Sequence, residues 1–393
     1  MHGIPLSYGV AHAILSERER IMNSATAQAR PQRLLVGACG MGNGHSSRQL
    51  SLVAHLRRRG HRVAITTFGE GVRALDGAFE TPVPILEPTH FPGGWVPMLP
   101  DGIDVGGAAR AGRQVDPRGD AWNFALCERV VEVLGGAPDA VLTDYEPASA
   151  QIAYMTGARL ITTEQQSKFL LYQTPDIGGL TRRQEAAKLR YFFPAADARV
   201  ASSFFPMEWE RDERFAGEVT APILRPEIVE LAPEVDESLV LVYLSPWAAI
   251  RGDLRQAPAL FGAHPEKRFL VFSAEDLGPV PKNVETRRLD RTEFTKALAS
   301  CAAVIATAGH QLLSECVYLG KPVLALPFDV YEQRFNAAMA ERWGFGVSAD
   351  TLSPERLRAF LERREAYAAA AAELAARLRT AEKVEDLLDR LGF

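Results

Sequence analysis

Short apolar runs alternate with amphipathic stretches along most of the chain, which predicts strands alternating with helices. In the first half the apolar runs lie at 33–38, 62–67, 140–143, 159–163 and 198–201, and helical periodicity marks ranges such as 47–60 and 147–157. In the second half the runs lie at 239–244, 268–273, 284–289, 303–306 and 322–326. Because strands that alternate with helices form parallel sheets covered on both faces, the pattern predicts the α/β class.

Two stretches interrupt this alternation. Residues 80–120 form a long irregular excursion rich in proline and glycine, and segments of this kind often carry function. Residues 217–237 contain clustered prolines, which are typical of a linker. We therefore predict two doubly wound domains, with an N-terminal extension over 1–30, a first domain over 31–216, a linker over 217–237, a second domain over 238–352 and C-terminal helices over 353–393.

The composition narrows the class of protein. The 393 residues are enough for two domains, and the formal charge of −5 gives no overall basic field that would attract nucleic acid. The four cysteines form no Cys-x-x-Cys pair, so we expect neither a metal knuckle nor a disulfide framework and favour a reducing cytoplasm. No apolar run approaches the roughly 20 residues that a membrane-spanning helix needs.

The sequence GACGMGNGH, residues 37–45, follows the first predicted strand and allows two interpretations. A dinucleotide-binding loop has the spacing Gly-x-Gly-x-x-Gly and an acidic residue about 20 positions later. Gly40, Gly42 and Gly44 put the third glycine one position early, although Glu70 follows the next strand. A nicotinamide site therefore stays as an alternative.

The second interpretation depends on His45, which lies where this loop turns into the predicted helix. The positive potential of a helix N-terminus disfavours a protonated imidazole, so a histidine there suits the role of general base. Asp144 follows a predicted strand at the same edge and is suited to orient that histidine. Simple helix capping by both residues is the structural alternative that the spacing leaves open.

In the second half, the strand at 303–306 runs into Thr307-Ala308-Gly309 and then into a helix. The free N–H groups at such a helix start form an anion site suited to a diphosphate, and Gly309 allows a close approach to the backbone. Gln311 and Glu315 are four positions apart and so share one face of this helix.

The segment VIATAGHQLLSECVYLGKPVLALPFDVYEQRFNAAMAERWGFG, residues 304–346, resembles the donor-binding segment of GT-B glycosyltransferases. Those families include the plant and antibiotic glycosyltransferases, the bacterial transferase that forms lipid II, and bacterial or archaeal relatives with the pattern NAGH…E…GKP…P…EQ…NA. The segments GNGH and TDYEP in the first half are also shared. The resemblance implies a GT-B fold of two Rossmann-like, doubly wound parallel-sheet domains facing a cleft. The first domain would bind the acceptor, the second the donor, and the last helix would cross back to the first domain.

The resemblance also implies roles for single residues. Glu315 would bind the ribose hydroxyls of the donor, and Gln311 would meet its phosphates. Glu332 and Gln333 would bind hydroxyls of the donor sugar, and Asn336 matches an asparagine of the family. The expected donor-binding set is completed by Ser245, Thr307, Gly309 and His310.

Departures from the family pattern leave the nucleobase open. Many relatives have a histidine at the position of Thr307, whereas this chain has His310 after the glycine. The usual Gly-Ser loop is replaced by LSPWAAIRGD, residues 244–253, in which Ser245 is expected to meet phosphate. LDRTEF, residues 289–294, stands where plant enzymes carry a base-stacking tryptophan.

On this resemblance we predict an inverting glycosyltransferase that moves a sugar from a UDP- or TDP-sugar to a hydroxyl of a small natural-product or lipid-like acceptor. His45 is the expected base and Asp144 its partner, while Gly42, Gly44, Phe91 and Trp95 are expected on the acceptor side. The segment 164–166 is also expected to face the cleft. Because the helix start can stabilise the leaving diphosphate, no metal or other cofactor is expected.

Several questions stay open at this level. A monomer and a homodimer fit equally well. The stretch TRRQEAAKLRYFF, residues 181–193, predicts either a solvated helix or a weak contact with a membrane surface. Two other functions fit the same architecture. A nucleotide-sugar epimerase or hydrolase would turn over the donor without an acceptor, and a nucleotide-sugar-binding protein would not turn it over at all.

Overall fold

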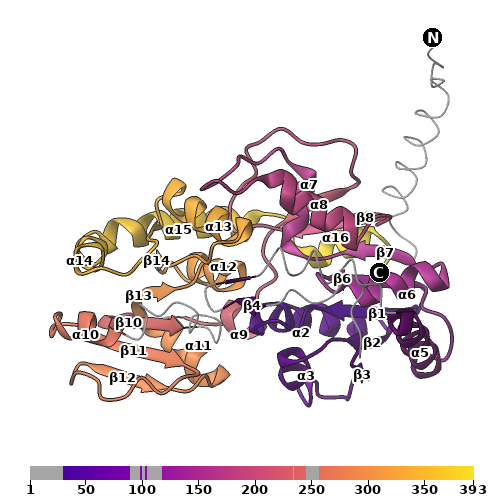
Figure 1. Cartoon of the computed structure of the whole chain (residues 1–393), viewed down its shortest axis with the longest axis horizontal. Helices are drawn as coiled ribbons and strands as arrows, with labels where there is room; N and C mark the ends of the chain where they lie inside the picture. The colour runs from indigo at the N-terminus through magenta and orange to yellow at the C-terminus, as the bar shows by residue number, and fades with distance from the viewer. Residues whose placement is uncertain (1–29, 89–97, 100–101, 104–116, 233, 245–255) are drawn as a thin grey trace, which may run out of the picture.

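The computed structural model describes residues 30–88, 98–99, 102–103, 117–232, 234–244 and 256–393, which form two parallel-sheet domains (Figure 1). The α/β class predicted from the alternation is confirmed. The predicted N-terminal extension lies outside the described residues except for its last position.

The first sheet has seven parallel strands in the order β3-β2-β1-β6-β7-β8-β9. These strands are β1 (Arg33–Ala38), β2 (Arg62–Thr66), β3 (Ile85–Leu86), β6 (Ala140–Asp144), β7 (Arg159–Thr162), β8 (Ala198–Ser202) and β9 (Gly217–Thr220). The helices of this half are α2 (Asn43–Arg58), α3 (Glu70–Leu75), α5 (Pro117–Leu134), α6 (Pro147–Thr156), η1 (Gln165–Ser167), α7 (Lys168–Leu171) and α8 (Arg182–Phe192). A short antiparallel ribbon of β4 (Met98–Leu99) and β5 (Gly102–Ile103) follows β3.

Helices cover both faces of this sheet because its strands bury apolar side chains on both sides. Leu34 and Val36 of β1 belong to a cluster with apolar residues of α2 and of the C-terminal helix α16 (Val384–Arg390). Leu35, which points to the opposite face, belongs to a cluster with residues of α5 and α6. The alternation along one strand therefore decides which helices pack on which face.

The second sheet has six parallel strands in the order β12-β11-β10-β13-β14-β15. They are β10 (Asp236–Leu244), β11 (Arg268–Ser273), β12 (Val284–Arg287), β13 (Cys301–Ala306), β14 (Val323–Ala325) and β15 (Gly346–Ser348). The remaining helices are α9 (Pro226–Val229), α10 (Ala257–Gly262), α11 (Arg291–Ser300), α12 (His310–Tyr318), α13 (Tyr331–Arg342), α14 (Pro354–Glu362) and α15 (Arg364–Thr380).

An apolar core joins the two domains. Phe169, Phe204 and Phe205 of the first domain belong to the same buried cluster as Leu313 and Phe335 of the second. The rings of Phe169 and Phe335 meet edge to face, with centroids 5.2 Å apart. Aromatic surface buried in this way stabilises the arrangement of the domains.

The C-terminal chain runs along the second domain as α14 and α15 and then returns to the first domain as α16 (Figure 1). Gln32, just before β1, donates from Nε2 to the carbonyl of Gly392 at 2.6 Å. Phe393 is buried, and the guanidinium of Arg159 lies 5.2 Å from its ring centroid. The far end of the chain therefore completes the covering of the first sheet.

Several elements differ from the sequence-based expectations, among them β3, which pairs with β2 inside the range predicted as an irregular excursion. Helix α2 begins at Asn43 because Gly42, with a φ of 68°, turns the chain at the N-cap, so His45 lies inside the first turn. Strand β9 occupies the start of the range predicted as a linker and pairs with β8. Strand β15 was not predicted, and its short, half-buried sequence gives no apolar run.

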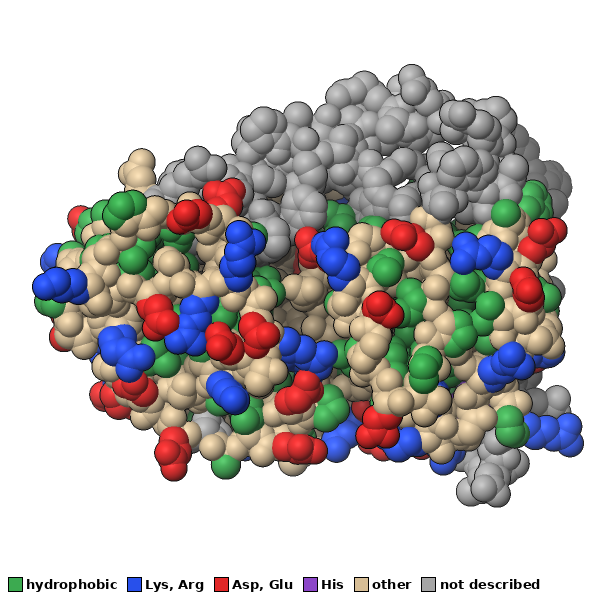
Figure 2. All heavy atoms as spheres, turned by 90° about the horizontal axis from the view of Figure 1, so that it is seen from below, with side chains coloured by type: hydrophobic (Ala, Val, Ile, Leu, Met, Phe, Trp, Pro, Cys, Tyr) green, Lys and Arg blue, Asp and Glu red, His purple; other side chains and the backbone are tan. Residues whose placement is uncertain are grey.

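Figure 2 shows acidic and basic side chains mixed over the face of the molecule seen from below, without a continuous field of one sign. Within the described ranges, no helix combines the length and the hydropathy that a bilayer crossing requires.

Candidate active site

His45 and Asp144 meet at the carboxyl-terminal edge of the first sheet. Strands β1 and β6 are parallel neighbours, with Ala38 opposite Asp144, so the chain leaving β1 enters α2 beside the end of β6. The Nδ1 atom of His45 lies 2.8 Å from Oδ1 of Asp144. The structure therefore brings together the two residues that sequence reasoning paired.

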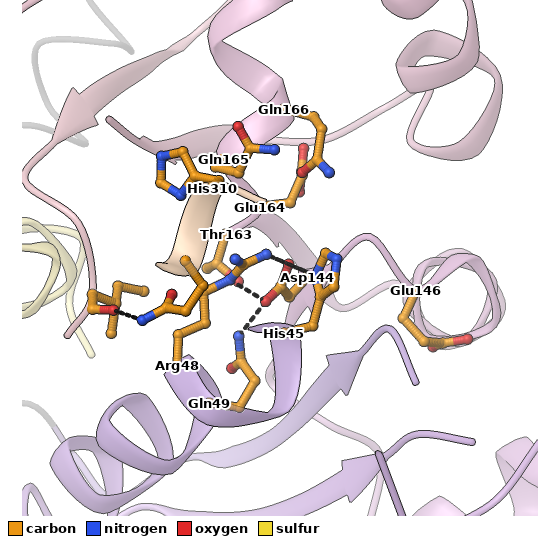
Figure 3. Close-up of polar contacts among 12 residues, drawn as sticks. His45, Arg48, Gln49, Asp144, Glu146, Thr163, Glu164, Gln165, Gln166 and His310 are labelled. Carbon is orange, nitrogen blue, oxygen red and sulfur yellow. Dashed lines mark hydrogen bonds and ion pairs between the residues drawn. The ribbon is translucent and has the colours of Figure 1, made fainter. Parts of the chain in front are cut away.

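Two further residues of α2 bind the same carboxylate (Figure 3). Arg48 donates from Nε to Oδ2 and from Nη2 to Oδ1 of Asp144, both at 2.6 Å. Gln49 donates from Nε2 to Oδ2 at 2.8 Å. Sequence reasoning missed both, although positions three and four after His45 lie on the same side of a helix.

The carboxylate of Asp144 stays ionised at this site. Its side chain is buried, and burial alone would raise its pKa. The positive charge of Arg48, with the hydrogen bonds from His45 and Arg48, outweighs that effect and holds the pKa well below its usual range. A permanent acceptor for an imidazole N–H is therefore present.

This geometry suits His45 to proton abstraction. When Nδ1 carries its hydrogen, Asp144 accepts it, and Nε2 is left with a free lone pair. The imidazole side chain is 17 % exposed, so substrate can reach it. The neighbouring backbone is strained, because Tyr145 has a φ of 55°, a conformation that non-glycine side chains rarely adopt and that often marks functional sites.

Helix α12 of the second domain begins close to this pair. A Cβ added at Gly44 would lie 3.3 Å from Cβ of Gln311, so the first turns of α2 and α12 touch. Thr307 is nearly buried in the turn before α12, and no described side chain caps the helix at Gly309. The structure thus places the predicted diphosphate site beside the predicted base.

His310 opens α12 as a buried, neutral imidazole. Burial, followed by the positive charges of Lys168 and Arg48, lowers its pKa well below the usual value. Its ring lies 5.2 Å from that of Phe204. Within the described residues its Nε2 atom is buried without a hydrogen-bond partner.

Glu315 is held in a buried ion pair. Arg225 donates from Nε and Nη2 to its two carboxylate oxygens at 2.9 and 2.8 Å. Gln311 donates from Nε2 to the same carboxylate and to the carbonyl of Ile223, both at 3.1 Å. The role of Glu315 in ribose binding stays a prediction, and any ribose there has to share a carboxylate that already binds Arg225.

The predicted sugar-binding residues have distinct surroundings. Glu332 accepts from Nε2 of Gln166 at 2.9 Å and from Nδ2 of Asn336 at 3.4 Å. Asn336 also donates to the carbonyl of Ala308 at 3.0 Å. The side-chain oxygen of Gln333 accepts from the N–H of Phe328 at 3.0 Å, so this side chain holds the turn before α13.

The segment after β7 adds buried polar groups to the same region (Figure 3). Burial raises the pKa of Glu164 to about 7 and lowers that of Lys168 to about 7. Gln165 and Gln166 each keep a buried side-chain atom without a partner among the described residues. Sequence reasoning expected the segment 164–166 here but did not identify Lys168.

The remaining predicted positions divide into two groups. Ser245, Phe91 and Trp95 lie outside the described residues. Gly42 faces open space, whereas Gly44 contacts the second domain. Where side chains are described, no group of three or more His, Cys, Asp or Glu residues is placed to hold a metal ion.

Comparisons with known proteins identify the family of the chain and its fold. The family described as "Glycosyl transferase family 1" matches residues 122–364. A protein of Methanosarcina mazei described as an uncharacterized glycosyltransferase is 24 % identical over 353 residues, covering 80 % of this chain and 84 % of its own.

Solved structures share the fold. The calicheamicin glycosyltransferase CalG4 is 20 % identical, covers 89 % of this chain and 94 % of its own, and superposes with a TM-score of 0.58. MurG of Acinetobacter baumannii is 17 % identical, covers 92 % of this chain and 100 % of its own, and also gives 0.58. The predicted GT-B fold is confirmed.

Proposed function

The chain belongs to glycosyl transferase family 1, and from that premise we propose that it is an inverting enzyme using a UDP- or TDP-sugar and a hydroxyl-bearing acceptor. It is a glycosyltransferase of GT-B type. The observation that carries the proposal is the 2.8 Å contact between His45 and Asp144, at the edge where α12 begins. A base on one side and a helix N-terminus on the other suit a direct displacement.

In the proposed reaction, Nε2 of His45 takes the proton of the acceptor hydroxyl. The acceptor oxygen forms a bond to the anomeric carbon of the sugar. The bond from that carbon to the β-phosphate oxygen breaks, and its electron pair leaves with the nucleoside diphosphate. Attack from the face opposite the leaving group inverts the anomeric centre.

The second domain supplies the charge stabilisation that this step needs. The first N–H groups of α12, that of His310 among them, carry the positive end of the helix dipole. We propose that these groups stabilise the leaving diphosphate without a metal ion. The acceptor is proposed to be a small natural product or a lipid-like alcohol, because structural relatives include the calicheamicin enzyme and MurG.

The first test is nucleotide binding. Calorimetric titration of the full chain with UDP, TDP, GDP and NAD should give binding of UDP or TDP. Binding of NAD alone would favour the dinucleotide interpretation of residues 37–45. Incubation of the matching nucleotide–glucose with and without a panel of alcohols then separates transfer from donor hydrolysis or epimerisation.

The second test is the base. His45→Ala should lower transfer by roughly 100-fold to 10,000-fold, while nucleotide affinity is unchanged. His55→Ala, on the same helix but paired with Asp389, is the matched control and should transfer at the normal rate. Normal transfer by His45→Ala would contradict the assignment. The anomeric configuration of the product, read by NMR, tests inversion, and an assay in EDTA tests the metal-free step.

A further inference from the structure

Arg48 is a buried cation in direct contact with both members of the pair. The Nη2 atom of Arg48 lies 2.6 Å from Oδ1 of Asp144 and 2.7 Å from Nδ1 of His45, and that Oδ1 lies 2.8 Å from the same Nδ1. Three polar atoms thus form a near-equilateral triangle. Both Arg48 and Asp144 are almost completely shielded from water.

The carboxylate and the guanidinium in this triangle have opposite effects on the charge of the imidazole. A lone carboxylate beside a histidine favours the protonated ring, because the negative charge stabilises the positive one. The positive charge of the guanidinium, 2.7 Å from Nδ1, disfavours a second positive charge on the imidazole. The positive charge on Arg48 also cancels the negative charge of the Asp144 carboxylate.

We propose that Arg48 is a positioning residue of the site: it binds both oxygens of Asp144, cancels the charge of that carboxylate, and so keeps the His45 ring neutral. This inference rests on the proposed function in one respect only. The neutral ring has a use if Nε2 of His45 accepts the proton of the acceptor hydroxyl. Arg48 orients the base and sets its charge without touching the substrate.

The shape of the guanidinium is part of the argument. Nε and Nη2 form a fork that matches the two carboxylate oxygens, which fixes the plane of the carboxylate and turns Oδ1 toward His45. Gln49 reinforces the same orientation through Oδ2 but brings no charge. Comparing Arg48 with Gln49 therefore separates the effect of orienting the carboxylate from the effect of a neighbouring charge.

Other titratable groups near His45 do not replace this effect. Tyr145 stacks with the ring of His45, with centroids 6.3 Å apart, and burial raises its pKa well above the usual value, so it stays neutral. His310 is neutral as well. Glu164, Lys168 and Glu332 interact electrostatically with Arg48.

The test measures the titration of His45 directly. The full chain, with its eight histidines labelled with ¹³C at Cε1, is titrated by NMR between pH 5 and pH 9, and His45→Gln identifies the signal. In Arg48→Gln the carboxylate keeps its charge, so the midpoint of His45 should rise by about 1 to 2 pH units. Arg48→Lys keeps the charge and should restore most of the wild-type midpoint. Gln49→Leu is the charge-neutral control and should shift it by much less than Arg48→Gln.

A double variant keeps the proposal testable when Arg48→Gln does not fold. Arg48→Gln with Asp144→Asn removes both charges and keeps the hydrogen-bonding shapes, so the midpoint of His45 should stay within about 0.5 units of the wild type. A midpoint well below the wild type in the double variant would overturn the proposal, since the carboxylate charge would then dominate. So would an unchanged midpoint in Arg48→Gln.

These outcomes are independent of catalysis. The titration needs no donor or acceptor, so the Arg48 proposal can hold even when nucleotide binding and transfer fail. The reverse result, transfer without the expected shift, removes the role of Arg48 and leaves the proposed function standing.

Discussion

Gln166 of the first domain donates a hydrogen bond to Glu332 of the second, with 2.9 Å between Nε2 and Oε2. The bond joins the segment after β7 to the first turn of α13, at the position where the donor sugar is predicted to bind. The other oxygen of Glu332 accepts from Asn336. A sugar hydroxyl that reaches Glu332 therefore has to share or replace the bond from Gln166.

Glu332→Gln should weaken binding of the nucleotide sugar and leave binding of the free nucleotide unchanged. A hydrogen bond to a charged group contributes about 1.5 to 3 kcal/mol, which corresponds to a loss of roughly 10-fold to 150-fold in affinity. Calorimetry with the nucleotide and with its glucose derivative measures both. Glu341→Gln, on the same helix and bonded to the N–H of Ser348, is the matched control. An equal loss for both ligands would place Glu332 at the nucleotide instead.

Arg225→Met should destabilise the protein by about 3 to 5 kcal/mol, because it leaves the carboxylate of Glu315 buried without its cation. Unfolding in urea, followed by circular dichroism, measures the loss. The double variant Arg225→Met, Glu315→Leu removes both charges and should recover more than half of it. A double variant as unstable as the single one would mean that packing of Arg225, rather than its charge, stabilises this region.

The residues at the sheet edge were easier to predict from the sequence than the residues that bind them. His45 and Asp144 follow apolar runs that end at one sheet edge, so placing them together needed only the rule that parallel strands share an edge. Arg48 was within reach of the same reasoning, because it lies one helical turn after His45. The partner of Glu315 was not, since Arg225 is 90 positions away and no local pattern links them.

The sequence did not predict element boundaries correctly where the local residue preferences are weak. Helix α2 begins with Asn43 and Gly44, which are poor helix formers, so the sequence placed its start later. Strand β9 is at the sheet edge and only its last residue is buried, so its sequence has no apolar run. In both cases tertiary packing decides the structure against the local pattern.

The glycines of residues 37–45 should respond differently to substitution. A Cβ at Gly40 would lie 1.7 Å from the carbonyl oxygen of Phe68, which is backbone and cannot rotate away. A Cβ at Gly42 meets open space, and its cost is the strain of a positive φ, about 1 to 3 kcal/mol. Gly40→Ala should therefore lower the midpoint of urea unfolding more than Gly42→Ala does. The reverse order would mean that the β1–α2 turn relaxes away from Phe68.

Glu164 should make stability fall as the pH rises toward neutrality. Its side chain is buried, and burial raises its pKa from 4.5 to about 7 in the folded protein. Between these two values the folded state holds a proton that the unfolded state has lost, so the free energy of unfolding decreases with rising pH. The contribution is fully present below about pH 4.5 and is lost above about pH 7.

Glu164→Gln keeps the shape of the side chain and an acceptor for the hydroxyl of Ser167, but it cannot ionise. Its gain in stability over the wild type should grow between pH 5 and pH 8 and approach about 3 kcal/mol. Urea unfolding at both pH values measures the change. Glu146, whose pKa burial also raises to about 7, is present in both proteins and cancels in the comparison. Glu373→Gln, at an exposed position of α15, is the control, and its free energy of unfolding should change with pH as that of the wild type does. If the free energy of unfolding of Glu164→Gln also follows the wild type, the carboxyl group is ionised in the folded protein, with its charge compensated by Arg199.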